Sequence, residues 1–318
     1  IDLVFSGLQT YDKNGNIINE LAESVEISSD GKTYTFTLKN NIFWHDQRPL
    51  TADDVIFTVK TIQNSDYKSP LRANWVDVET EKISDTQLVF RLKRPYNSFL
   101  ENCTLKIIPK HIWENISPEN FALSLYNLQP VGSGPFQFTG INQGKTGFIE
   151  SVQLQSNRKY HRSASHIADL SFTFFESQDA LLKAAQANTI HGFSLATSDK
   201  TESDIDQEVN QGWFKKSTFS LNSFILPRYF AVFFNNDKTS LFSDGNIRKA
   251  LSHSVDKTSL LEKISEGSSK AVTAVTSPLI PDFYGLKNPS VSSQLDIEKA
   301  KGLLDKEGFK ENASGTRK

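Results

Sequence analysis

Histidine and cysteine are the residues best suited to metal or redox chemistry. A helical zinc site places two histidines four residues apart, and no pair in this sequence has that spacing. A closed site also needs three or four ligands, whereas His161 and His166 form only a loose pair. Cys103 is the only cysteine, which excludes paired-cysteine motifs and an intrachain disulfide. We expect no metal site and no cofactor. The six histidines are His45, His111, His161, His166, His191 and His253.

Two pairs that include acidic residues could support acid–base catalysis. His45 and Asp46 lie beside Trp44, but neighbouring residues on a strand point to opposite faces. We therefore favour a turn next to a buried tryptophan. Asp53 and Asp54 fall in the first turn of a predicted helix, where carboxylates suit the positive end of the helix dipole. Helix capping explains this second pair without catalysis.

Two glycine-rich segments match catalytic loops only in part. Residues 140–146 read Gly-Ile-Asn-Gln-Gly-Lys-Thr, with three residues between the glycines where a phosphate-binding loop needs four. A strand rather than a helix is predicted after them. Residues 132–135 read Gly-Ser-Gly-Pro, which lacks the Gly-x-Ser-x-Gly nucleophile elbow. We interpret both segments as turns, and we expect a protein that is not an enzyme.

Hydrophobic periodicity predicts the elements that position these segments. Apolar residues recur at every second position at 34–38 and at 88–92, which predicts strands. Turn clusters at 12–16 and 29–32 predict antiparallel hairpins. A third strand is predicted at 170–174 and a fourth at 229–234. Helices are predicted after Thr51 and Ser177, around 247–255, after Asp256, and from Asp296 to a left-handed stop at Gly308. The chain therefore reads as mixed α/β.

Composition excludes some partners. The 318 residues carry 35 Lys and Arg against 37 Asp and Glu, a net charge of −2. Nucleic-acid binding needs a clustered basic excess, so no nucleic-acid partner is expected. The length predicts two or three domains. The longest strongly apolar stretch, residues 224–234, is shorter than the roughly 20 residues that cross a bilayer. The 23 Phe, 8 Tyr and 4 Trp suffice to fill cores and line a ligand cleft.

Several motifs occur in a fixed order along nearly the whole chain. The strongest are Leu-Ala-Glu-Ser at 21–24, Asp-Gly-Lys-Thr-Tyr-Thr-Phe-Thr-Leu at 30–38, Phe-Trp-His-Asp at 43–46 and Leu-Thr-Ala-Asp-Asp-Val at 50–55. Supporting motifs are Ile-Pro-Lys-His-Ile at 108–112, Val-Gly-Ser-Gly-Pro-Phe at 131–136, Asn-x-x-Tyr at 157–160 and Ile-Arg-Lys-Ala-Leu at 247–251. Together they resemble the extracytoplasmic solute-binding proteins of ABC importers for oligopeptides, dipeptides and nickel chelates.

The resemblance implies an α/β, two-lobed periplasmic-binding-protein-like fold of type II, with an extra subdomain on the first lobe. By this analogy residues 1–6 and 133–230 form the core of lobe I, and residues 7–132 form the extra subdomain. Residues 231–318 are the first part of lobe II. The family's chain starts earlier and continues further, so the sequence resembles a fragment with an incomplete second lobe. Such a fragment is expected to aggregate or to bind ligand poorly when expressed alone.

Two departures from the family pattern are visible. Where the family often has Gly-Glu-Ile-Asp, this chain has Asn-Thr-Ile-His at 188–191, and His191 is expected to alter a wall of the cleft. Gln47 replaces the usual glycine of the Trp-His-Asp-Gly turn, which is expected to change only a loop. The acid that pairs with a peptide's α-ammonium in peptide-binding members belongs to later family sequence that this chain does not include.

The resemblance implies a non-enzymatic receptor, outside the bacterial cytoplasmic membrane or in the periplasm, that captures short peptides between its lobes and delivers them to ABC permease subunits. A monomer tethered through a segment upstream of Ile1 is expected. Residues that the family pattern places at the cleft are Trp75, Ser133, Gly134, Phe193, Ser194, Tyr229 and Asn235. A core position for Trp75 and a hinge role for Asn235 stay open.

Three alternatives remain at this point. The same fold could bind a nickel or other metal chelate, or another small solute, with His191 as a contact. A peptide hydrolase would need a nucleophile with a base in reach, and no such motif is found. A sensor or scaffold module would bind no small molecule.

Overall fold

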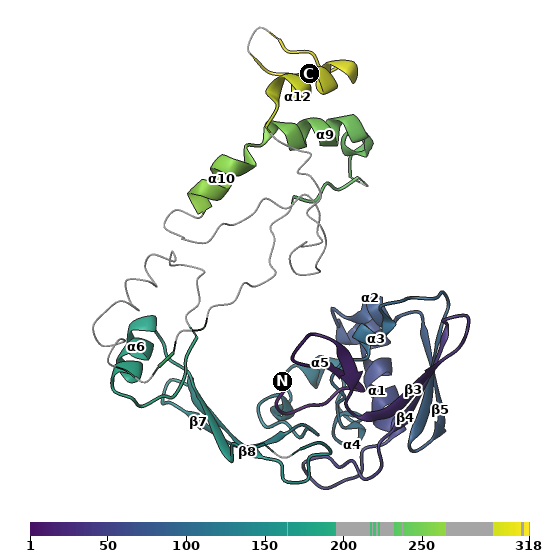
Figure 1. The fold of residues 1–318 in the computed structure, drawn as a ribbon, viewed down its shortest axis with the longest axis vertical. Helices are drawn as coiled ribbons and strands as arrows, with labels where there is room; N and C mark the ends of the chain where they lie inside the picture. The colour runs from purple at the N-terminus through teal and green to yellow at the C-terminus, as the bar shows by residue number, and fades with distance from the viewer. Residues whose placement is uncertain are drawn as a thin grey trace. The chain divides into compact units, whose positions relative to one another are not determined.

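The computed structural model describes residues 1–163, 165–194, 217, 219, 220, 222, 232–236, 238–264, 295–312 and 315–317. Two compact units, Ile1–Phe175 and Glu176–Lys318, divide the chain (Figure 1). Among the described residues, each helix is too short or too polar to cross a bilayer.

Antiparallel hairpins open the first unit, as predicted. β1 (Gln9–Tyr11) pairs with β2 (Ile17–Asn19). Asp12 closes their turn because its Oδ1 accepts the backbone N–H groups of Asn14 and Asn16 at 2.8 and 2.9 Å. A four-stranded sheet follows in the order β3-β4-β6-β5. Its strands are β3 (Ala22–Ile27), β4 (Thr33–Leu38), β5 (Val78–Ser84) and β6 (Gln87–Leu92).

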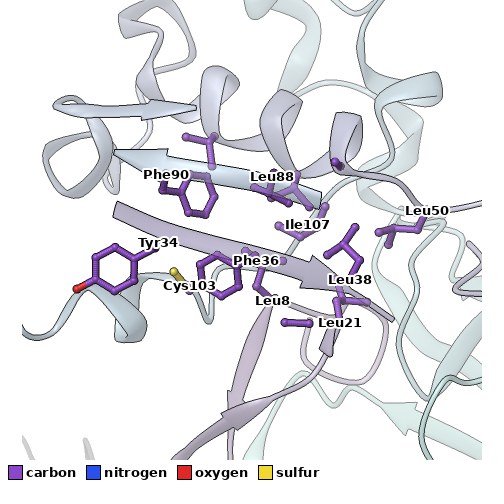
Figure 2. Packing of buried hydrophobic residues seen from close by; sticks show 14 of the residues in the cluster. Leu8, Leu21, Tyr34, Phe36, Leu38, Leu50, Leu88, Phe90, Cys103 and Ile107 are labelled. Carbon is purple, nitrogen blue, oxygen red and sulfur yellow. The ribbon is translucent and has the colours of Figure 1, made fainter. Parts of the chain in front are cut away.

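The core of this sheet confirms the predicted alternation. Tyr34, Phe36 and Leu38 on β4 are buried, while the threonines between them are half-buried. Phe36 meets Phe90 of β6 edge to face at 5.7 Å. Leu8, Leu21 and Ile107 belong to the same buried cluster (Figure 2).

Helix α1 (Ala52–Gln63) covers the sheet and begins at the predicted residue, Thr51. The Asp54 carboxylate accepts the N–H of Thr51 at 2.9 Å and the N–H of Lys110 at 2.8 Å. Asp53 instead forms an exposed ion pair with Lys82. The capping interpretation is confirmed for Asp54, and Asp53 lies in the first turn of the helix as predicted. Shorter helical segments are η1 (Ser65–Tyr67), α2 (Arg72–Trp75), α3 (Phe99–Asn102), α4 (Lys110–Trp113), α5 (Pro118–Phe121) and η2 (Leu125–Asn127).

A second sheet of the first unit has the order β7-β8-β9, all antiparallel. Its strands are β7 (Phe136–Gln143), β8 (Ile149–Ser156) and β9 (Asp169–Thr173). The glycine-rich segment after Gly140 is the end of β7 and its turn into β8, with Gly147 at φ 86°. The turn interpretation is therefore confirmed, because a strand and not a helix follows.

Two separate hydrophobic clusters lie in this unit. The larger contains buried residues from Leu8 to Ile107. The smaller contains Val4, Phe136 and Leu154. The clusters fall on opposite sides of the division that the resemblance places between residues 7–132 and residues 1–6 with 133–230. The domain boundaries themselves stay predictions, as does the one at residue 230.

The regular elements described in the second unit are helices. They are α6 (Gln178–Gln186), η3 (Ser240–Ser243), α9 (Gly245–Ser254), α10 (Lys257–Ile264) and α12 (Ile297–Lys306). Ser177 caps α6 through its Oγ, Asp256 accepts the N–H of Ser259 at 3.0 Å, and Gly308 has φ 88°, all as predicted. Helices α9 and α12 pack together, and Ile247, Ala250 and Ala300 on these helices are buried.

The strand predicted at 229–234 is not found at residues 232–234, the part of this range that the structure describes. Residues 229–231 lie outside the described residues. Val232 and Phe233 belong to no strand and are 83% and 84% exposed. An apolar run alone does not make a strand, because strand hydrogen bonds need a partner, and none of the described residues supplies one here.

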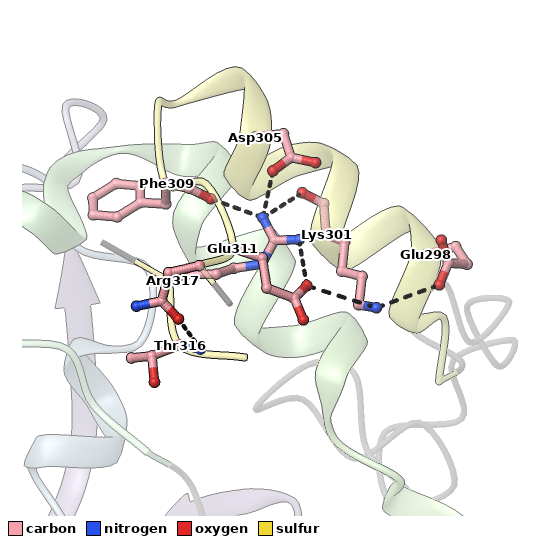
Figure 3. A network of polar contacts seen from close by, with 8 residues as sticks. Glu298, Lys301, Asp305, Phe309, Glu311, Thr316 and Arg317 are labelled. Carbon is pink, nitrogen blue, oxygen red and sulfur yellow. Dashed lines mark hydrogen bonds and ion pairs between the residues drawn. The ribbon is translucent and has the colours of Figure 1, made fainter. Parts of the chain in front are cut away.

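Arg317 links the segment after α12 to that helix through hydrogen bonds (Figure 3). Its guanidinium donates to the Asp305 carboxylate at 2.5 Å and to the Phe309 carbonyl at 2.7 Å. A further contact joins Arg317 to Glu311 at 3.3 Å. The planar guanidinium reaches several acceptors at once, so this arginine closes the end of the helix.

Candidate functional site

The loop at residues 132–135 contains two of the predicted ligand contacts and is held first by the chain's N-terminal segment. Gly134 N–H donates to the Val4 carbonyl at 2.8 Å, and Phe136 N–H donates to the Leu3 carbonyl at 2.9 Å. A Cβ atom on Gly132 would lie 1.8 Å from the Val4 oxygen. Only glycine allows the two backbones to approach so closely.

His45 holds the same loop from the other side. Its backbone N–H donates to the Gly132 carbonyl at 2.8 Å. Its ring accepts the Gly132 N–H at Nδ1 at 3.2 Å, and Nε2 lies 3.1 Å from the Gly134 carbonyl. Because Nδ1 accepts, the proton resides on Nε2, which then donates. Burial lowers the pKa of His45, which favours this neutral form.

The interpretation of residues 44–48 as a turn is confirmed. Gln47 N–H donates to the Trp44 carbonyl at 2.9 Å, and the Trp44 ring is buried. Asp46 pairs with His111 at 2.7 Å rather than with its neighbour His45. The two members of the suspected dyad therefore have separate structural partners.

Glu20 is a buried carboxylate that the local sequence pattern does not single out, and it links the N-terminal segment to Tyr160. Glu20 accepts the Gly7 N–H at 3.0 Å and the Tyr160 hydroxyl at 3.1 Å, and Lys106 lies 3.7 Å away. Burial and the Glu20 charge raise the pKa of Tyr160 to about 12. Asn157 adds a bond from its Nδ2 to the Gly134 carbonyl at 3.1 Å. The Asn-x-x-Tyr motif was the available signal, since it includes both Asn157 and Tyr160.

Three predicted ligand contacts are buried in the first unit. Trp75 is 2% exposed and packs its ring against Phe90 and Phe99 at 5.5 and 5.6 Å. It is a core residue, the alternative that the sequence left open. Ser133 is 0% exposed, and Gly134 is also buried. All three residues occupy packed positions in this structure, and the ligand contacts predicted for them stay predictions.

The other predicted contacts belong to the second unit. The Phe193 ring is half-buried against Phe219 at 5.3 Å, and Ser194 is exposed. Asn235 is exposed, and its Oδ1 accepts the Lys238 N–H at 3.1 Å. Tyr229 lies outside the described residues. His191 is exposed, and no group of three metal-ligating side chains occurs within the described part of the chain.

Comparison with known proteins assigns the family. The model of "Bacterial extracellular solute-binding proteins, family 5 Middle" matches residues 16–318. The oligopeptide-binding protein AppA of Bacillus subtilis is 26% identical over 315 residues, which cover 98% of this chain and 55% of that protein. The chain thus spans about half the length of this curated relative.

Solved structures agree with the sequence match. NikZ from Campylobacter jejuni, in complex with Ni(L-His), has a TM-score of 0.73 at 26% identity, over all of this chain and 60% of NikZ. The ABC transporter substrate-binding protein CtaP from Listeria monocytogenes has a TM-score of 0.73 at 29% identity, over 97% of this chain and 60% of CtaP. The fold is therefore that of the periplasmic binding proteins, and the chain belongs to family 5 of the bacterial extracellular solute-binding proteins.

Proposed function

We propose that this chain is part of an extracytoplasmic receptor that captures short peptides and delivers them to the permease of an ABC importer. The observation that carries the proposal is the family match over residues 16–318, together with a relative named as an oligopeptide-binding protein. The receptor acts by binding and not by turnover, and it is extracytoplasmic like the rest of its family.

Closure of two lobes around the peptide supplies the mechanism. A ligand that contacts both lobes shifts the equilibrium between the open and closed states. The shift equals the difference in its binding free energy for those two states. Such a device works best when each lobe moves as one body. The bonds of His45 with Gly134 and of Glu20 with Tyr160 support this for the first unit, since they join residues 7–132 to the residues that follow.

In addition to the buried Trp75, Ser133 and Gly134 of the first unit, the proposed peptide contacts include four residues of the second unit. They are Phe193, Ser194, Tyr229 and Asn235. Peptide backbones are held by main-chain hydrogen bonds, and roomy apolar pockets accept the side chains. Phe193 suits such a pocket because its ring is only partly covered.

Calorimetric titration of the native protein with a mixed tri- to pentapeptide library tests this function. We expect saturable binding without loss of intact peptide. Phe193→Ala is expected to weaken binding about tenfold, the loss of roughly 1.4 kcal/mol. Phe148→Ala is the matched control, because Phe148 is an exposed phenylalanine in the β7–β8 turn. Steady hydrolysis of the peptides, or equal weakening by both variants, would contradict the proposal.

A metal chelate is the second candidate ligand. The likeness to NikZ, solved with Ni(L-His), favours it. His191 is the residue we would assign as a contact. Titration with Ni(L-His) in place of peptide separates the two: a nickel ligand predicts tight binding that His191→Ala weakens, and no competition by the peptide library.

A further inference from the structure

A pocket of about 400 Å³ opens in the first unit. Gln137 of β7 and Gln155 of β8 stand opposite each other in the sheet and form one wall. The turn at residues 156–159 forms a second wall. Gln47, at the tip of the turn 44–48, and Ala168, just before β9, complete the lining.

The lining is polar and carries positive charge. It offers four side-chain amides, one hydroxyl and two cations: Gln47, Gln137, Gln155, Asn157, Ser156, Arg158 and Lys159. None of these lining residues is acidic. The adjacent carboxylate of Asp169 is engaged with Gln155, whose Nε2 lies 3.5 Å from its Oδ1. Amides and hydroxyls both donate and accept, and guanidinium and ammonium groups attract anions.

Parts of the walls are fixed before any ligand arrives. Asn157 is 7% exposed and donates to the Gly134 carbonyl, and its Oδ1 accepts the Lys159 N–H at 3.0 Å. Gln47 is held at φ 71° by bonds from its Nε2 to the His45 carbonyl and from Lys159 Nζ to its Oε1. A prearranged polar wall reduces the ordering cost of binding.

Other donors in the pocket are still available. Within the described part of the chain, the Arg158 guanidinium forms no hydrogen bond or ion pair with another residue, and neither the Gln137 amide nor the Ser156 hydroxyl has a side-chain bond. If all polar groups of the lining were bonded to one another, few donors would remain for a ligand. Here a guanidinium, an amide and a hydroxyl remain free to bind one.

We propose that this pocket binds a small polar solute through its anionic group, a carboxylate or a phosphate. Arg158 supplies a planar guanidinium that can bind a carboxylate or a phosphate through two parallel hydrogen bonds, and Lys159 adds charge. The amides of Gln137 and Gln155 and the hydroxyl of Ser156 hold the polar remainder of the solute. The site lies entirely within the first unit, and its existence does not depend on peptide capture.

Calorimetric titrations of the native protein with citrate and with inorganic phosphate, at constant ionic strength set by chloride, test the site. Saturable one-to-one binding of either anion is expected, and the tighter one identifies the anionic group. Arg158→Gln should weaken it at least tenfold. Arg94→Gln is the matched control, because Arg94 is an exposed arginine of the same unit that does not line the pocket.

Two results would overturn the site. One is the absence of saturable binding of both anions, and the other is equal weakening by Arg158→Gln and Arg94→Gln. Thermal melts of the two variants check that each is folded. Peptide titration of Arg158→Gln keeps this test apart from the proposed function, since peptide affinity should be unchanged.

Discussion

His161 is a partly buried imidazole whose Nε2 is shielded from solvent and has no hydrogen-bond partner among the described residues. Burial, together with the charges of Lys39 and Arg162, lowers its pKa to about 4. The folded protein therefore holds this group neutral. In the unfolded chain the same group titrates near its ordinary pKa of 6.5, so the unfolded state binds more protons between these two values.

This difference predicts a loss of stability in acid. The free energy of unfolding keeps the full contribution of the neutral His161 above pH 6.5 and loses it as the pH falls towards 4. Between pH 7 and pH 5 this loss is about 1–2 kcal/mol. Urea unfolding at the two pH values measures it. His161→Gln should remove this part of the pH dependence, whereas His166→Gln, at an exposed position, should keep it. A pH slope unchanged by His161→Gln would refute the assignment.

Gln47 illustrates which single-residue features can be read from sequence. Its replacement of a family glycine predicted an altered loop, and its φ of 71° shows why a glycine suits that position. The burial of Trp75 and of Glu20 could not be read in the same way. Each depends on contacts with residues far away in the chain, such as Glu20 with Tyr160, and a local pattern carries no information about them.

At the scale of elements, helix α1 offers a matched pair of acids. Asp54 accepts two backbone N–H groups and is buried, whereas Asp53 only pairs with Lys82 at the surface. Asp54→Ala leaves the Thr51 and Lys110 donors without their acceptor, so we expect a loss of about 2–4 kcal/mol. Asp53→Ala should be indistinguishable from the wild type.

Chemical denaturation of the two variants tests this. Both substitutions remove one carboxylate from the same helical turn. The net charge and the charge that faces the helix dipole therefore change equally. Equal destabilisation would show that charge near the helix end, and not the two bonds of Asp54, stabilises the start of α1.

Elements with strong local signals were predictable. The hairpins, α1 and the helices after Ser177, Asp256 and Asp296 carry caps, turns and periodicity within a few residues of each other. The strand predicted at 229–234 had only an apolar run to support it. An apolar run does not show whether a neighbouring strand is present, and Val232 and Phe233 are exposed.

At the scale of the whole molecule, the first unit joins two hydrophobic clusters through buried polar bonds. The larger cluster includes Leu8 and Phe36, and the smaller includes Val4 and Phe136. Hydrogen bonds of this kind have fixed geometry and leave costly unpaired groups when broken. They are expected to hold the two clusters together while the receptor opens and closes, so that ligand-linked movement occurs at a hinge outside this unit.

Peptide capture is the central claim, and native mass spectrometry of the protein purified from its own cells tests it most directly. We predict an adduct of several hundred daltons on the native protein, released on denaturation and fragmenting as one or more short peptides. An adduct with a nickel isotope pattern would contradict peptide capture and favour the metal-chelate alternative. A protein that carries no adduct and gains none after exposure to a peptide library would contradict the account of a peptide receptor.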